Sequence, residues 1–160
     1  MPTSVKHLTK PEKRKPTRVL ALDLGHHTGW CVDKKNHGHF DTDGLSIGVE
    51  LQFFEDKVND LMVRFWPFDI VAYERPHLRG WAATFSLIGR AAIIEKLMSR
   101  RNIKPISVHP STIKKFITGS GRATKEDVME AVKDWRPDGP DEADAIALWL
   151  YTKSKMEEKK

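Results

Sequence analysis

Val-Leu-Ala-Leu-Asp-Leu-Gly, residues 19–25, is a nearly unbroken apolar run that carries one acid and ends in glycine. A run of this length without polar alternation is typical of a β-strand buried on both faces of a sheet. Residues 69–73, Asp-Ile-Val-Ala-Tyr, form a second such run, and Glu74 follows directly. Both runs therefore predict central strands, each with a carboxylate near its carboxyl end.

Shorter patterns outside these runs complete a mixed α/β chain. A hairpin is expected across residues 35–37, because short strand-like runs flank them. Between Ser46 and Pro67, apolar side chains recur at helical spacing, beginning with Val49. We predict a mixed five-stranded sheet with helices on both faces. The remaining predicted strands are 30–34, 38–42 and 105–108, and the helices are 46–66, 82–101, 111–117, 124–135 and 141–151.

The length of 160 residues and a hydrophobic share of 39% suit one domain with one core. We expect a basic flexible arm at 1–17, a folded domain at 18–155 and a charged tail at 156–160. The single cysteine, Cys31, excludes an internal disulfide. No stretch approaches the roughly 18 apolar residues that a membrane span needs, so we expect an intracellular, cytoplasmic protein.

Charge is segregated along the chain. Residues 1–18 hold six Lys or Arg and one Glu, and residues 90–125 hold nine Lys or Arg against Glu95 alone. A basic sector beside an acidic one is compatible with a polyanion held near bound cations. The arm itself fits two interpretations equally, a solubilising tail and a polybasic arm that holds nucleic acid through phosphate contacts.

Four carboxylates are the candidate reactive groups. Asp23 and Glu74 end predicted strands, and binding sites of open α/β sheets collect at the carboxyl ends of parallel strands. Asp141 and Asp144 lie three residues apart at the start of the last helix, which places both on one helical face. Asp141 alone also fits a simple helix cap, whereas Asp144 lies in an apolar segment where an unpaired charge is costly.

Such a cluster of acids calls for metal ions. Two divalent cations would cancel the formal charge of four carboxylates, and oxygen ligands of this kind select Mg²⁺ or Mn²⁺. Two such ions about 4 Å apart can hold a phosphodiester, activate water and stabilise the leaving oxygen.

Basic and aromatic residues lie in the segments that we expect to surround this cluster. Lys114 and Lys115 precede Gly119-Ser-Gly-Arg122-Ala-Thr-Lys125, where a glycine pair before a helix suits either phosphate binding or a bare turn. The loop after Glu74 offers a second set that can contact nucleic acid, with Trp81 able either to stack on a base or to pack on its helix. This second set is Arg75, His77, Arg79 and Trp81.

Four quoted motifs, in this order and spacing, give the chain a family resemblance. They are Leu-Asp-Leu-Gly with Thr28-Gly29 beyond, Val-Ala-Tyr-Glu at 71–74, Ile-Lys-Lys-Phe-Ile-Thr-Gly-Ser-Gly-Arg-Ala-Thr-Lys at 113–125, and Asp-Glu-Ala-Asp-Ala-Ile-Ala at 141–147. From Arg18 to about Lys153, the chain resembles the RuvC family of Holliday junction resolvases, which have a ribonuclease H-like fold. The short loop of residues 75–81 is similar to that of phage-encoded members, which would act in the host cytoplasm.

The resemblance implies a Mg²⁺-dependent homodimeric endonuclease that nicks two opposed strands of a four-way DNA junction in recombination and repair. It implies that the four acids are metal ligands, with Mn²⁺ able to substitute. Lys114 and Lys125 fall on the family's basic positions near the scissile phosphate, and helix 82–101 falls on its dimer helix. His77 occupies the position of the family's aromatic wedge, with Trp81 as a substitute.

Two other functions stay open on the residues alone. One is a ribonuclease H-like nuclease that acts more broadly on branched DNA or RNA–DNA hybrids. The other is a junction-binding protein without catalysis, although the presence of all four acids counts against it.

Overall fold

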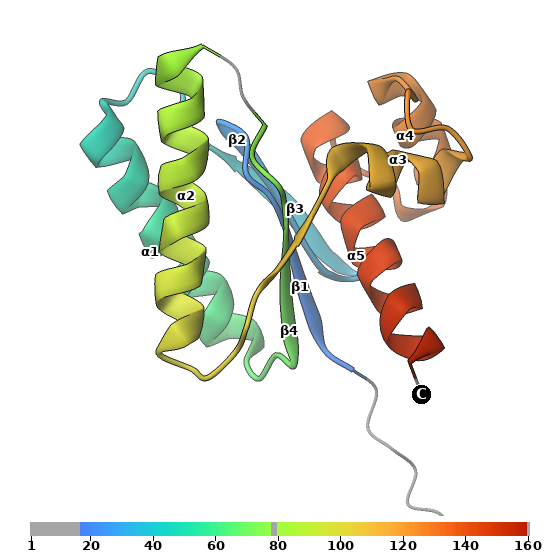
Figure 1. Cartoon of the computed structure of the whole chain (residues 1–160), viewed down its shortest axis with the longest axis horizontal. Coiled ribbons are helices and arrows are strands. Elements are labelled where there is room, and N and C mark those ends of the chain that lie inside the picture. The colour runs from blue at the N-terminus through green and yellow to red at the C-terminus, as the bar shows by residue number, and fades with distance from the viewer. Residues whose placement is uncertain (1–16, 78–79, 160) are drawn as a thin grey trace, which may run out of the picture.

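The computed structural model of the chain describes residues 17–77 and 80–159. Its core is a five-stranded sheet in the order β3-β2-β1-β4-β5, flanked by helices on both faces (Figure 1). The predicted mixed α/β architecture is confirmed. The strands are β1 (Val19–Asp23), β2 (His27–Asp33), β3 (Asn36–Asp41), β4 (Ile70–Glu74) and β5 (Ile106–Val108). The helices are α1 (Ile47–Phe65), α2 (Trp81–Ser99), α3 (Pro110–Thr118), α4 (Lys125–Ala131), a 3₁₀ turn (Lys133–Trp135) and α5 (Pro140–Glu158).

One strand of the sheet, β2, runs opposite to the other four. β1 runs antiparallel to β2, and β2 runs antiparallel to β3, whereas β1 and β4 are parallel neighbours. β5 extends the parallel half on the other side of β4. The carboxyl ends of β1, β4 and β5 therefore meet at the same edge of the sheet.

Alternation of side chains along the strands builds two cores. Leu20 and Leu22 of β1 pack on the side of α1 and α2, whereas Ala21 points into the core that lies beneath α5. The second core is rich in small residues, including Ala143 and Ala147 of α5. Because short side chains separate them, α5 can lie close against the central strands.

The boundaries and faces of several elements differ from the predictions. In α1 the inward face carries Phe54, Val58, Leu61 and Met62, while Val49 is 54% exposed, so only the start of the expected apolar face differs. α5 continues to Glu158, which makes most of the expected tail helical. The arm expected at 1–17 lies outside the described residues except for Thr17.

A buried ion pair joins α2 to α1, and its arginine also contacts the chain just after β1. Arg90 is 0% exposed and donates to a carboxylate oxygen of Glu50 on α1 at 2.5 Å and to the Leu24 carbonyl at 3.0 Å. The same guanidinium donates to the Thr42 hydroxyl at 2.5 Å, and the Ser86 hydroxyl donates to Glu50. Burial lowers the pKa of Arg90, and the negative charge of Glu50 opposes that shift. Leu24 directly follows Asp23, so the hydrogen bond from Arg90 to Leu24 holds the end of β1 in place.

Candidate active site

The ends of β1 and β4 bring the first two acids together. Leu22 pairs with Tyr73 in the parallel ladder, and Asp23 and Glu74 each follow by one residue. Both carboxylates line a cleft with a volume of about 160 Å³. The predicted convergence of Asp23 and Glu74 at one edge of the sheet is therefore present in the structure.

The start of α5 supplies the other two acids, and a glycine makes room for it. Gly29 of β2 lies opposite Asp23 in the antiparallel ladder. A Cβ atom on Gly29 would stand 2.0 Å from the Asp141 carbonyl oxygen, so any other residue would push α5 away from the sheet. With glycine there, Asp141 and Asp144 line the same cleft as Asp23.

Glu142, which directly follows Asp141, is anchored to the edge strand β3. Glu142 is buried, pairs with His37 of β3 and lies 3.6 Å from the ring nitrogen of His39. Asp141 does not cap its helix, because Gly139 occupies the N-cap position and no side-chain cap forms there. The first turn of α5 is thus fixed from the sheet side, which leaves Asp141 in the cleft.

Crowding of the acids shifts their titration. Burial raises the pKa of Asp23 well above its ordinary value, and the negative charges of Glu74, Asp144 and Asp141 raise it further. Burial also raises the pKa of Asp144 to about 6, while the positive charge of Lys114 opposes that shift. Without a cation, the cleft therefore disfavours full ionisation of its own carboxylates.

Lysines on two short helices face this charge. Lys125 lines the cleft and begins α4, where Thr124 and Asp127 form a capping box. Lys114 lies on α3, outside the cleft lining but near enough to favour the ionised form of Asp144. No ion pair within 4.0 Å ties Asp144 to a lysine or arginine among residues 17–77 and 80–159.

The expected DNA-contacting residues are only partly gathered here. Arg75 and His77 line the cleft, as their position after Glu74 suggests. Trp81 opens α2, is 82% exposed and stacks on Phe85 with ring centroids 5.8 Å apart. The contact with Phe85 fits the expected alternative in which Trp81 packs on its own helix, although most of its ring stays exposed and open to a ligand.

The remaining members of that set lie elsewhere. Lys115 lines a different hollow, beside Phe116 on α3, and Arg122 is exposed in the turn before α4. Gly119 ends α3 with a positive φ of 86°. The first glycine of the pair therefore terminates helix α3. Arg79 lies outside the described residues.

Sequence reasoning missed Gly29 and Glu142 as parts of the site. A glycine inside a strand often marks close approach of another backbone, and that signal was present in Thr28-Gly29. Glu142 gave no such signal, because its histidine partners lie about a hundred residues earlier. Pairing of this kind appears only when the chain is folded.

The four carboxylates of the cleft suit divalent metal ions in ligand type and in charge. All four are carboxylates, the ligand type that Mg²⁺ and Mn²⁺ prefer, and the charges of the other three add to the burial that raises the pKa of Asp23. Across the described part of the chain, no three His, Cys, Asp or Glu side chains already stand in a metal-holding group. Ligation would therefore require these carboxylates to draw closer together.

Known proteins resemble this chain over most of its length. No family model matches it. A crossover junction endodeoxyribonuclease RuvC from Bartonella bacilliformis is 30% identical in an alignment of 146 residues that covers 82% of this chain and 87% of the relative. The RuvC of Pseudothermotoga lettingae is 28% identical over 72% of this chain and 76% of its own length.

Solved structures share the fold. T. thermophilus RuvC in complex with a Holliday junction substrate matches with a TM-score of 0.67 and 18% identity, over 87% of this chain and 96% of that one. The yeast mitochondrial Holliday junction resolvase Ydc2 matches with a TM-score of 0.63 and 14% identity, over 89% and 81% of the two chains. By its sequence relatives and its ribonuclease H-like fold, the chain belongs to the RuvC family of crossover junction endodeoxyribonucleases.

Proposed function

We propose that this chain is a Holliday junction resolvase, a metal-dependent endonuclease that makes paired symmetric nicks in four-way DNA junctions. The observation that carries the proposal is the convergence of Asp23, Glu74, Asp141 and Asp144 in one cleft, with Lys125 on its wall. A cluster of four acids and a lysine fits phosphodiester hydrolysis, because the acids can hold cations and the lysine can meet phosphate. The substrate is inferred from RuvC and Ydc2.

The four carboxylates would hold two Mg²⁺ ions, with Mn²⁺ as a substitute. When bound, such ions supply Lewis acidity that activates water and stabilises the departing oxygen. The acids themselves fix where these ions sit, because the β1–β4 ladder and the close approach of α5 over Gly29 set their positions.

Two lysines act on the phosphate as catalytic residues in this proposal. Lys125 lies on the cleft wall at the first turn of α4, where its ammonium group can meet the scissile phosphate. Lys114 provides positive charge from α3. Loss of either should reduce the rate more than the affinity, because charge develops in the transition state.

The DNA path extends beyond the cleft along the loop after β4. Arg75 and His77 contact the backbone next to the cut, and Trp81 stacks on an unpaired base near the junction centre. Arg79, Lys115 and Arg122 add positive charge to the DNA-binding surface.

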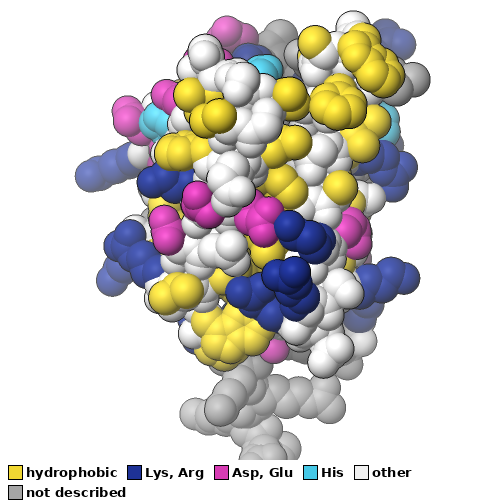
Figure 2. Space-filling view, turned by 90° about the vertical axis from the view of Figure 1, so that its left-hand side faces the viewer, with side chains coloured by type: hydrophobic (Ala, Val, Ile, Leu, Met, Phe, Trp, Pro, Cys, Tyr) yellow, Lys and Arg dark blue, Asp and Glu magenta, His cyan; other side chains and the backbone are white. Residues whose placement is uncertain are grey.

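Symmetric nicking needs two active sites, so the working form would be a homodimer. Exposed apolar side chains lie on α1, α2 and the segment before α1, the half of the fold that includes the expected dimer helix. Figure 2, which views the molecule from that side, shows hydrophobic side chains gathered over much of its upper half. Burial of such a patch would favour association. These exposed side chains include Leu45, Ile47, Val49, Phe85 and Ile88.

The domain organisation and location are proposed with the activity. Residues 18–155 form the nuclease domain, and residues 1–17 form a basic arm that adds phosphate contacts in the cytoplasm, including a host cytoplasm. Among the described residues, no helix is both long and apolar enough to cross a membrane.

Cleavage of end-labelled four-way junctions, with a metal titration, tests the function. The wild-type chain should cut opposed strands at matching positions, and Asp23→Asn should bind junctions without cutting them. A Y fork and an RNA–DNA hybrid, assayed in parallel, separate a resolvase from a broader nuclease. Binding without cleavage in both Mg²⁺ and Mn²⁺ would instead identify a non-catalytic junction-binding protein. Equal cutting by Asp23→Asn would overturn the mechanism.

A further inference from the structure

A second hollow, larger than the catalytic cleft, lies between the edge strand β5 and the carboxyl half of α5. Its volume is about 410 Å³, within the range of roughly 300–1,000 Å³ typical of sites that enclose organic ligands. We call it the β5–α5 groove. Its lining consists of Arg75, Ile106, Ser107, Val108, His109, Thr112, Tyr151, Thr152, Lys155, Met156 and Lys159.

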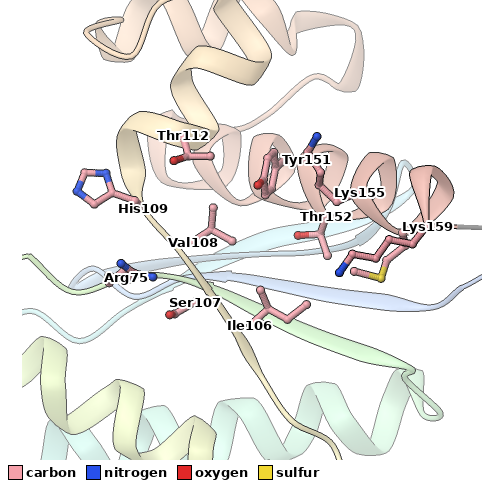
Figure 3. A pocket seen from close by; sticks show the side chains of 11 residues that line it. Arg75, Ile106, Ser107, Val108, His109, Thr112, Tyr151, Thr152, Lys155 and Lys159 are labelled. Atoms are coloured by element: carbon pink, nitrogen blue, oxygen red, sulfur yellow. The ribbon is translucent and has the colours of Figure 1, made fainter.

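The β5–α5 groove begins at the catalytic cleft. Arg75 lines both hollows, and its backbone N–H donates to the Val108 carbonyl at the end of β5. In Figure 3, Arg75 and His109 lie at one end of the groove and Lys159 at the other, with Ser107 and Ile106 on the strand between them. Arg75 therefore links the two hollows, and a DNA strand that leaves the cleft past Arg75 can reach this groove.

The lining combines positive charge with an apolar floor. Arg75, Lys155 and Lys159 contribute cations, and no acid lines the groove within the described residues. Lys155 pairs with Glu158 at 2.8 Å, but both side chains are exposed, so a phosphate can compete with that weak pair. Ile106 and Val108 form apolar surface between the cations.

Neutral donors add phosphate-binding capacity. The Nδ1 atom of His109 accepts the Ser111 backbone N–H at 3.2 Å, so in the neutral ring Nε2 carries the proton and can donate. Thr112, which carries a hydroxyl group, lines the same hollow. Charged and neutral donors thus occur along the length of the groove.

Aromatic surface continues beyond the groove. A neighbouring hollow of about 500 Å³ shares Thr112, Tyr151 and Lys155 with it and adds Lys115 and Phe116. The Tyr151 and Phe116 rings meet edge to face at 5.5 Å, and the Lys155 Nζ lies 5.9 Å from the Tyr151 ring centroid. Apolar and aromatic surface between cations is typical of sites for unpaired nucleotides, whereas duplex backbone presents only phosphate and sugar.

We propose that the β5–α5 groove binds a single-stranded DNA segment that continues from the catalytic cleft, with phosphates on Lys155 and Lys159 and a nucleoside on the apolar floor. This inference rests on the proposed nuclease function, because that function places DNA in the adjoining cleft. It assigns DNA contacts to a strand edge and helix end that lie outside the four-acid site.

Binding to a short oligothymidylate in metal-free buffer tests the groove. The variant is Lys155→Ala/Lys159→Ala, and the control is Lys34→Ala/Lys35→Ala, which removes the same charge at the opposite edge of the sheet. Two lost phosphate contacts should lower the slope of log affinity against log salt by about 1.4, at about 0.7 per contact for single strands. If affinities converge near 1 M salt, the variant should bind about 25-fold more weakly at 0.1 M.

A fluorescent label locates the bound strand. Cys31 is buried, so Thr112→Cys offers a single accessible thiol in the groove, and Lys35→Cys offers one on the control hairpin. Oligothymidylate should change the emission of the label at 112 and leave the label at 35 unaffected. No response at 112, or equal losses of affinity in both double variants, overturns the proposal.

Two further measurements distinguish failure of the groove proposal from failure of the proposed nuclease function. A blunt duplex of the same length should show a smaller effect of Lys155→Ala/Lys159→Ala than the oligothymidylate, and a loss confined to the duplex would overturn the single-strand assignment. Wild-type junction cleavage reports independently on the proposed function. Normal cleavage with an unchanged variant refutes the groove alone, whereas absence of wild-type cleavage refutes the nuclease.

Discussion

Arg90→Met should be the most damaging single substitution behind the active site. The substitution removes a fully buried guanidinium. It leaves Glu50, whose side chain is 5% exposed, without its cationic partner. Removing one member of a buried ion pair costs about 3–5 kcal/mol, because the other charge stays desolvated. The Leu24 carbonyl also loses a donor at 3.0 Å. We therefore expect a loss of about 3–5 kcal/mol in the free energy of unfolding.

Urea unfolding, followed by far-ultraviolet circular dichroism, measures that loss. Lys96→Met is a matched control, because Lys96 also lies on α2 and also pairs with a glutamate of α1, Glu55, at 2.7 Å. Its side chain is 47% exposed, so its pair should contribute at most about 1 kcal/mol.

A double variant separates charge from packing. Arg90→Met/Glu50→Leu removes both charges, and it should recover much of the stability that Arg90→Met loses. Because Leu24 follows Asp23, the double variant should still cut junctions more slowly than wild type. Equal losses in Arg90→Met and Lys96→Met would refute the reasoning, and so would full wild-type cleavage by the double variant.

Three further outcomes follow from the site. Gly29→Ala should reduce metal affinity, measured by calorimetry, as well as cleavage, because a Cβ 2.0 Å from the Asp141 carbonyl must displace α5; wild-type metal affinity would contradict this. In metal-free buffer near pH 7, Asp23→Asn should raise the urea midpoint, since it removes a buried carboxylate among like charges; a lower midpoint would show that the acids do not repel. Burial raises the pKa of Tyr73 to about 12. The stability that the neutral Tyr73 hydroxyl adds to the folded state is therefore present below about pH 10 and should fade as the pH rises towards 12. Ultraviolet titration of the wild type against Tyr73→Phe measures this pKa.

Local patterns were enough to predict the elements that carry Asp23 and Glu74. The apolar runs before these acids have no alternation, and only strands covered on both faces bury such runs. The order of strands and helices then predicted a mixed sheet covered on both faces, and the structure confirms it. The capping box at Thr124 and Asp127 was also readable, because all its atoms come from four consecutive residues.

Faces and long-range partners were harder to predict. Val49 fitted the helical period of α1, yet it is exposed, because the position of α1 on the sheet selects which stripe is buried. Arg90 sits in an apolar helix with no local sign of a partner, and Glu50 lies forty residues away. Such pairs depend on how elements pack, which no local period encodes.

The sequence by itself determined the strands, the helices and which acids stand at their ends, because hydrogen-bonding period and side-chain polarity act over a few residues. Only the tertiary structure decided that α5 descends over Gly29 to set Asp141 beside Asp23, and that β5 and α5 leave a basic groove leading away from the cleft. Both features arise where segments that are distant in the chain come into contact. The space left between such segments depends on how the helices and the sheet pack together.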